Sequence, residues 1–214
     1  MNAVLNVAQV TANMMVLGYG QTRAGLWVQG CHLGCPGCSS LHTHDPARGR
    51  LVAVDKIIDW LRGHSKCMDG LTISGGEPMQ QADSVLALIR AFRDAFGESD
   101  ILMYSGLTWR ELIRRYEELI KACDVVIAGP YVQTLPALPL RGSSNQTVHV
   151  LTPLARERYH DVDRWPVHAI QASFRNDRLI TVGIPDAAKL SDSIQANPVF
   201  DANTASWIQP KSEH

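Results

Sequence analysis

The segment LWVQGCHLGCPGC, residues 26–38, places three cysteines on a loop that directly follows a short apolar strand pattern. The strand pattern spans residues 26–29, and Cys31, Cys35 and Cys38 follow it within eight positions. In α/β proteins, chemical sites lie where strands end at their C-terminal side. Glycines between the thiols let the backbone turn tightly, so the three sulfur atoms can face one centre. The segment therefore predicts a metal or cluster site at the edge of a sheet.

The number of cysteines limits which kinds of metal site this loop can form. An ordinary [4Fe-4S] cluster takes four cysteines, and the two others, Cys67 and Cys123, stand alone and are expected to be buried, inert thiols. A cluster on this loop would therefore leave one iron for a ligand that is not a protein residue. The same loop could instead hold a structural zinc ion, with His42 or His44 as its fourth ligand. The residues leave both alternatives open, and no histidine is assigned as a ligand.

A second motif, SGGEP at residues 74–78, follows the next strand pattern, residues 71–74. Its two glycines expose backbone groups, and the carboxylate of Glu77 suits a ligand that carries an ammonium group. Other strand patterns also end in small or polar residues, namely Ser105-Gly106, Gly129-Pro130 and Gly183-Ile184-Pro185. A flat ligand that lies across several strand ends would explain why small or polar residues occur at the end of each of these strands.

Strand and helix patterns alternate along most of the chain, which predicts an α/β fold with a parallel sheet. Thr108 and Glu111 have the spacing of a capping box at the start of a helix. Residues 130–153 lack periodicity and contain four prolines, which indicates an ordered loop. The further expected strands are residues 4–16, 101–104, 124–128, 147–151 and 178–182, and the expected helices lie within residues 54–63, 85–96 and 112–120.

Composition excludes several classes of protein. The chain has 214 residues, of which 45% are hydrophobic, enough for one sizeable core. Its formal net charge of -1 gives no long-range attraction for nucleic acid or an anionic membrane, so neither is expected as a partner. No apolar run approaches the roughly 20 residues that cross a bilayer, and no basic residue precedes Arg23 as a secretory segment would require. We expect a cytoplasmic protein.

Together, the two motifs resemble those of the radical S-adenosylmethionine (SAM) superfamily, in which CxxxCxxC follows a first strand and GGEP a second. Within it, CPGC at residues 35–38 and RGSSNQ at residues 141–146 are similar to the family of activating proteins of anaerobic ribonucleotide reductase. The resemblance covers approximately residues 12–151. It implies a partial (β/α)6 TIM barrel over residues 1–185 and a C-terminal tail, residues 186–214, that could cover the active site.

The resemblance also implies cofactors and the residues that bind them. Cys31, Cys35 and Cys38 would hold a [4Fe-4S] cluster, and SAM would chelate its fourth iron. No amino acid is nominated as a catalytic acid, base or nucleophile, because the cofactors carry the difficult chemistry. The implied SAM contacts are Gly75, Gly76 and Glu77 at the methionine amino end, Ser105 at the ribose or carboxylate side, and the backbone near Gly37 and Val182 at the adenine.

The implied function is reductive cleavage of SAM to a 5'-deoxyadenosyl radical that abstracts hydrogen from a protein substrate, a glycyl radical enzyme such as anaerobic ribonucleotide reductase. A flavodoxin- or ferredoxin-type protein would donate the electron. Residues 152–214 exceed the compact chains of this family, so modification of a peptide or small molecule is the alternative. A non-catalytic zinc module on the same loop is the third reading.

Overall fold

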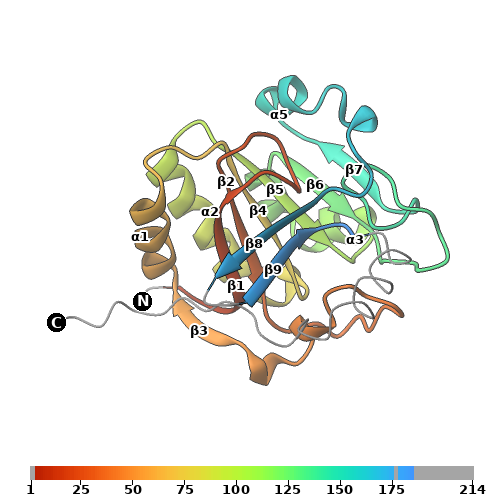
Figure 1. Ribbon diagram of the computed structural model, residues 1–214, viewed down its shortest axis with the longest axis horizontal. Coiled ribbons are helices and arrows are strands. Elements are labelled where there is room, and N and C mark those ends of the chain that lie inside the picture. Colours follow the sequence, from red (N-terminus) through yellow and green to blue (C-terminus); the bar gives the residue numbers. More distant parts are fainter. Residues whose placement is uncertain (1–2, 176–177, 186–214) are drawn as a thin grey trace.

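The computed structural model describes residues 3–175 and 178–185, and within them it has a mixed α/β fold built on one seven-stranded sheet (Figure 1). The strand order is β3-β1-β2-β4-β5-β6-β7. The strands are β1 (Val4–Met14), β2 (Arg23–Val28), β3 (Arg50–Ala53), β4 (Gly70–Gly75), β5 (Asp100–Ser105), β6 (Val125–Ala128) and β7 (Thr147–Val150).

The centre of the sheet is parallel and its margins are antiparallel. Strands β2, β4, β5 and β6 run in the same direction, whereas β1 and β3 on one side and β7 on the other pair antiparallel with their neighbours. In the parallel register, Arg23 pairs with Gly70 and Gly70 with Asp100, so these three strands begin together. Their C-terminal ends therefore meet at one edge, as predicted for the two motifs.

One face of the sheet carries the main hydrophobic core and four helices, α1 (Val54–His64), α2 (Ala82–Phe96), α3 (Trp109–Arg115) and α4 (Glu117–Ala122). Side chains alternate along a strand, so Ile101 and Met103 belong to this core while Leu102 faces the other side. The capping box of Thr108 and Glu111 is confirmed at the start of α3. One helix was expected over residues 112–120, but Tyr116 leaves helical geometry (φ -133°, ψ 32°) and divides α3 from α4.

The opposite face carries a second, smaller core. Leu102, Val125 and Ile127 of the sheet pack with Ala155 and Tyr159 from the region of α5 (Pro153–Arg158). Helix α5 was not expected from the sequence. In Figure 1 it lies beside β7, at the end of the molecule away from α1. Four short 3-10 helices complete the described helices, at Leu41–Thr43, Pro46–Arg48, Pro78–Gln81 and Val162–Arg164.

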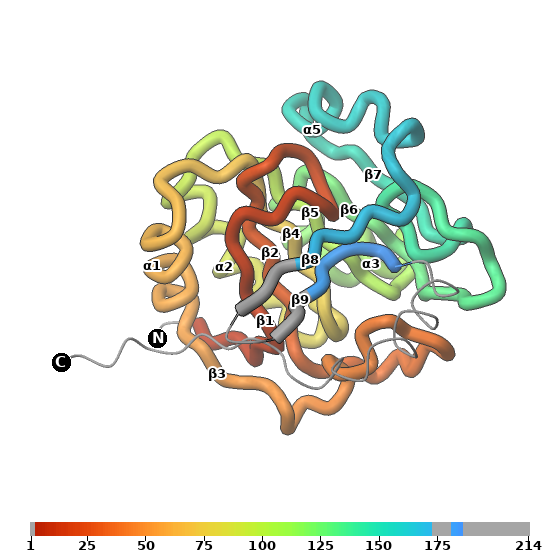
Figure 2. Tube along the Cα trace, viewed as in Figure 1, coloured from red at the N-terminus to blue at the C-terminus, as the bar shows by residue number. Residues whose placement is uncertain are grey.

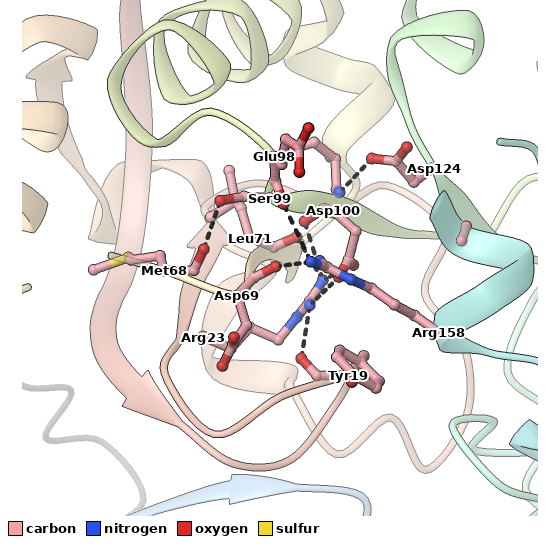
Figure 3. Close-up of polar contacts among 12 residues, drawn as sticks. Tyr19, Arg23, Met68, Asp69, Leu71, Glu98, Ser99, Asp100, Asp124 and Arg158 are labelled. Carbon is pink, nitrogen blue, oxygen red and sulfur yellow. Dashed lines mark hydrogen bonds and ion pairs between the residues drawn. The ribbon is translucent and has the colours of Figure 1, made fainter. Parts of the chain in front are cut away.

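A buried group of charges lies where β2 and β5 begin (Figure 3). Asp100 accepts hydrogen bonds from Arg23 (Nη2 to Oδ2, 2.6 Å; Nη1 to Oδ1, 3.0 Å), and both side chains are 0% exposed. Arg158 at the end of α5 donates to the same carboxylate (Nη1 to Oδ1, 2.9 Å), as does the hydroxyl of Tyr159 (2.8 Å). This network fastens α5 to the sheet.

The strand expected at residues 178–182 is present as β9 (Arg178–Gly183), but its partner was not foreseen. Strand β9 pairs antiparallel with β8 (Ile170–Arg175) in a two-stranded sheet separate from the large one. Figure 2 traces the chain from α5 to β8 in the same view. Strand β9 therefore does not extend the parallel series. Only the coarser α/β prediction is confirmed by this arrangement.

Cys67 and Cys123, the two cysteines outside the loop, differ in their exposure to solvent. Cys123 is buried, as predicted, at the end of α4, and burial raises its pKa to about 12. The prediction for Cys67 was wrong, because it lies exposed in the turn between α1 and β4, where its backbone N donates a hydrogen bond to the side chain of Ser65.

None of the described helices is long and apolar enough to cross a bilayer. The predicted tail, residues 186–214, lies outside the described residues.

Candidate active site

The cysteine loop is anchored by its own backbone at the C-terminal end of β2. Gly30 N donates to Thr43 O (2.8 Å) and Cys31 N donates to His44 O (3.0 Å), so the chain from Gly30 to His44 returns on itself. The side chain of Gln29 donates to two further carbonyls of the returning segment, those of His42 (3.1 Å) and Asp45 (2.6 Å). These hydrogen bonds join the two ends of the loop that carries the three cysteines.

The three thiols of this loop are free and half-buried. Burial raises the pKa of Cys31 and of Cys38, and the neighbouring cysteine thiols raise both further. Each of these two thiols therefore has another thiol of the loop in its electrostatic environment. Within the described residues, however, no three His, Cys, Asp or Glu side chains converge closely enough to hold a single metal ion.

The glycine turn after β4 packs directly on the start of the cysteine loop. Gly76 N donates to Val28 O (2.8 Å) and Glu77 N donates to Gly30 O (2.9 Å). Gly75 has a φ of +107°, and a Cβ there would lie 2.5 Å from Val28 O. A Cβ on Gly76 would overlap the carbonyl of Gly30. The two motifs can approach this closely only because both positions lack a side chain.

Glu77 is 3% exposed, and its carboxylate joins the ends of two strands. One oxygen accepts from Ser105 Oγ (2.8 Å) and from Met79 N (3.1 Å), and the other accepts from Gly106 N (2.8 Å). Burial raises the pKa of Glu77, while the hydrogen bonds from Gly106, Met79 and Ser105 lower it. The structure thus brings together Glu77 and Ser105, which the resemblance assigned to the methionine amino end and to the ribose or carboxylate side of SAM. It uses the carboxylate to brace the strand ends.

A cavity of about 440 Å³ opens where these elements meet. Eight of the nine predicted site residues line it, and Val182 is the exception, although the three residues that follow it do line the cavity. The predicted residues in the lining are Cys31, Cys35, Gly37, Cys38, Gly75, Gly76, Glu77 and Ser105. A cavity of this size is typical of a small-molecule site.

The RGSSNQ segment forms another wall of the cavity, and its hydrogen bonds explain its composition. The side chain of Gln146 accepts from Gly142 N (2.8 Å) and donates to Gly129 O (3.0 Å), while Asn145 donates to Pro130 O (2.8 Å). The segment is therefore closed against the end of β6 and presents Gly142 and Gln146 to the cavity, next to Tyr131. The sequence predicted an ordered loop here but gave no sign that it lines the site.

Leu17 and Tyr104 are among the further lining residues that the sequence did not indicate. Leu17 has a φ of +62°, and its carbonyl accepts from Thr72 Oγ1 (2.7 Å). Tyr104 lies in β5, and its hydroxyl donates to Leu140 O (2.9 Å). Side chains alternate along β5, which places Tyr104 on the same face of the sheet as Leu102. That alternation is the signal that could have found Tyr104.

Comparisons with known proteins agree with the motifs. The family model that matches residues 16–149 is described as a 4Fe-4S single cluster domain. The anaerobic ribonucleoside-triphosphate reductase-activating protein of Vibrio cholerae is 34% identical over 138 residues, which cover 61% of this chain and 89% of that protein. The protein of the same name from Escherichia coli K12 is 34% identical over 137 residues, with the same two coverages.

A third relative of that name, from Haemophilus influenzae, is 30% identical over 152 residues, which cover 68% of this chain and 97% of the relative. Among solved structures, QueE from Escherichia coli overlaps with a TM-score of 0.41 and 16% identity, over 49% of this chain and 54% of that chain. This structural overlap is too weak to bear on the fold.

Proposed function

Because the chain belongs to the family of anaerobic ribonucleoside-triphosphate reductase-activating proteins, we propose that it installs a glycyl radical on an anaerobic ribonucleotide reductase. Membership confirms the resemblance drawn from the sequence. The chain is a radical SAM enzyme of the activase type, and its cofactors are a [4Fe-4S] cluster and SAM. The observation that carries the proposal is the meeting of the cysteine loop and the glycine turn at one cavity, within the part of the chain that its relatives share.

The residues of the cavity fit these cofactors. Three free thiols lie on one loop with no fourth cysteine beside them, which suits a cluster that keeps one iron for SAM. We assign the cluster to Cys31, Cys35 and Cys38. We assign the SAM contacts as the sequence suggested, to Gly75, Gly76, Glu77 and Ser105 at the strand ends, and to the backbone near Gly37 and Val182.

A [4Fe-4S] cluster held by Cys31, Cys35 and Cys38 would supply the electron for reductive cleavage of SAM, and the bound SAM would supply the radical chemistry that removes hydrogen from the substrate. The protein's own residues bind these cofactors and orient them. Glu77 holds the ends of β4 and β5 at a fixed separation through Ser105 and Gly106. Apolar walls, including Trp27 and Leu33, limit access of water to the cavity.

Two structural predictions belong to this proposal. The four parallel strands β2, β4, β5 and β6, with helices on one face, are consistent with part of a (β/α) barrel, and we propose that the fold is a partial barrel of the radical SAM type. We further propose that residues 1–185 act as one domain. The electron donor is proposed to be a flavodoxin or ferredoxin.

The test is a glycyl radical assay. The reconstituted, reduced protein is incubated without oxygen with SAM and a panel of anaerobic ribonucleotide reductases, including those of Vibrio cholerae and Escherichia coli. We expect a glycyl radical signal by electron paramagnetic resonance with at least one of them, and no signal when SAM is omitted. Absence of the signal from every reductase, with SAM still cleaved, would contradict the proposal.

One observation favours the alternative, modification of a peptide or small molecule. The family model ends at residue 149, yet the chain continues through α5 and the β8–β9 hairpin. A substrate that is consumed over many turnovers, without a protein radical, would support this alternative. In that case the same cluster and SAM site would serve a different second reactant.

A further inference from the structure

Gln81 ends the 3-10 helix Pro78–Gln81 and is a part-buried residue that the site assignments above do not use. Its side chain reaches past the end of β2 to β1. Nε2 donates to Asn6 O (3.0 Å) and to Gln29 O (3.0 Å), and Oε1 accepts from Asn6 N (2.7 Å). The amide of Gln81 therefore joins the segment after the glycine turn to the backbone of β1 and to the residue that follows β2.

This amide fixes one of the two peptide groups that lead to Cys31. The group joins Gln29 to Gly30. Its carbonyl oxygen accepts the hydrogen bond from Gln81, and its N–H donates to Thr43 O (2.8 Å). Gly30 has a φ of +107°, and glycine has more backbone freedom than any other residue. The two hydrogen bonds therefore restrict a rotation that Gly30 itself leaves free.

The next peptide group, which joins Gly30 to Cys31, is bonded in the same way. Its carbonyl accepts from Glu77 N (2.9 Å), and its N–H donates to His44 O (3.0 Å). Both peptide groups are thus held between the segment that follows β4 and the returning part of the cysteine loop. The hydrogen bond from Glu77 comes from the backbone, whereas the one from Gln81 comes from a side chain. Only the latter depends on the identity of the residue.

The returning part of the loop is held by the same two residues that Gln81 contacts. Gln29 is 4% exposed, and its side chain donates to the carbonyls of His42 and Asp45. The side chain of Asn6 donates from Nδ2 to Pro46 O (2.8 Å). A change at Gln81 therefore acts on the start of the cysteine loop and on the segment where it returns.

We propose that Gln81 is a positioning residue for the cluster. Its amide fixes the direction in which the chain leaves β2 for Cys31, and thereby the position of the three thiols relative to the glycine turn. Gln81 does not line the cavity, so it acts through Gln29 and Gly30 and does not touch a cofactor. The inference rests on the proposed assignment of the cluster to the three thiols and of SAM to the glycine turn. It does not depend on which substrate receives the radical.

The experiment compares the reconstituted wild type with Gln81→Glu, Gln81→Met and Gln80→Met. Gln81→Glu keeps the shape of the side chain and an acceptor for Asn6 N, but a carboxylate cannot donate to Gln29 O. Gln81→Met keeps the length of the side chain and removes all three hydrogen bonds. Gln80→Met is the matched control, because Gln80 is exposed and directly precedes Gln81 in the same 3-10 helix.

All measurements are made without oxygen and without a protein substrate. They are the iron content per chain, the midpoint of urea unfolding, the dissociation constant of SAM by equilibrium dialysis and the rate of 5'-deoxyadenosine formation. The electron paramagnetic resonance spectrum of the reduced cluster is also recorded before and after SAM is added, because the spectrum responds to a ligand bound at an iron.

We expect both Gln81 variants to keep the iron content of the wild type, because the three thiols are still present. The dissociation constant of SAM should rise at least about fivefold, and the rate at saturating SAM should fall at least about tenfold, since small displacements of reacting groups are costly. The spectral change on adding SAM should be smaller than in the wild type. Gln81→Glu should be at least as impaired as Gln81→Met, and Gln80→Met should stay within about twofold of the wild type.

Wild-type binding and cleavage of SAM in Gln81→Glu would refute the inference and leave the cluster assignment and the proposed function intact. Loss of the cluster or of folded protein from both Gln81 variants, with normal cleavage by any cluster that remains, would also refute it, because Gln81 would then only support the fold. Failure of the fully loaded wild type to cleave SAM would overturn the site assignment and this inference together. Absence of a glycyl radical while SAM is cleaved would overturn the proposed function alone.

Discussion

The two ends of the parallel strands are built by opposite means. At the C-terminal ends, glycines bring backbone against backbone, and a cavity lined by three thiols remains open. At the N-terminal ends, Arg23, Asp100 and Tyr159 fill the space with buried charges and hydrogen bonds. The comparison indicates that one end of the sheet is committed to binding and the other to holding the fold together. Substitutions at the two ends should therefore separate activity from stability.

The largest effect is expected from Asp100→Asn. This change removes the carboxylate that faces two guanidinium groups, and the loss of one partner from a buried ion pair costs about 3–5 kcal/mol in the free energy of unfolding. Anaerobic urea unfolding followed by circular dichroism measures it. Asp163→Asn is the control, because Asp163 pairs with Arg141 but is 82% exposed, and it should cost at most about 1 kcal/mol. Equal effects of the two changes would contradict the assignment of the network to stability.

In contrast to Asp100→Asn, Gly76→Ala should lower activity more than stability. The added Cβ overlaps the Gly30 carbonyl, so the start of the cysteine loop must shift. A displaced cluster or cofactor costs about 100-fold in rate even for small shifts. Iron content and the rate of SAM cleavage measure this loss. Gly63→Ala in α1, where a Cβ meets nothing within 4 Å, should leave both unchanged. A Gly76→Ala protein with full iron and normal cleavage would show that the close approach of the two motifs is not needed.

A smaller, pH-dependent effect is expected for Asp69, which lies next to the network. Burial raises the pKa of Asp69, but hydrogen bonds from Thr22 and Gln21 and the charge of Arg158 outweigh it, so the pKa is lowered on folding. A carboxyl with a lowered folded pKa stabilises the protein above its unfolded pKa of about 3.9 and loses this contribution as pH falls through the folded value.

The stability advantage of the wild type over Asp69→Asn should therefore be largest above about pH 5 and shrink as the pH falls below about 4. Urea unfolding of both proteins across this range measures the difference. A difference that stays constant with pH would show that the carboxylate of Asp69 does not stabilise the fold through its charge.

The same two ends explain what could be predicted from the sequence. The cysteine loop and the glycine turn directly follow apolar strand patterns, and neighbouring parallel strands bring their C-terminal ends together, so local reading was enough to place both motifs at one site. The capping box at Thr108 and the core faces of α1 and α2 were predictable for the same reason. Each depends on residues that are close in the sequence.

The network could not be predicted, because its partners are distant in the sequence and charged residues are usually exposed. Arg23 lies 77 positions from Asp100, and only the finished sheet makes their burial favourable. The pairing of the β8–β9 hairpin could not be predicted either. Its sequence has the pattern of a strand, but this pattern does not indicate which strand it pairs with. The contribution of Gln146 to the cavity also depends on its bonds to Gly129 and Gly142.

The most direct test of the site is anaerobic SAM cleavage by the reconstituted wild type, Cys35→Ala and Cys67→Ala. Cys35 lines the cavity, while Cys67 lies exposed in a distant turn and controls for the loss of any thiol. The account predicts about four irons per wild-type chain, with 5'-deoxyadenosine formed by the wild type and Cys67→Ala and none by Cys35→Ala. Undiminished cleavage by Cys35→Ala would contradict the assignment of the cluster to this loop.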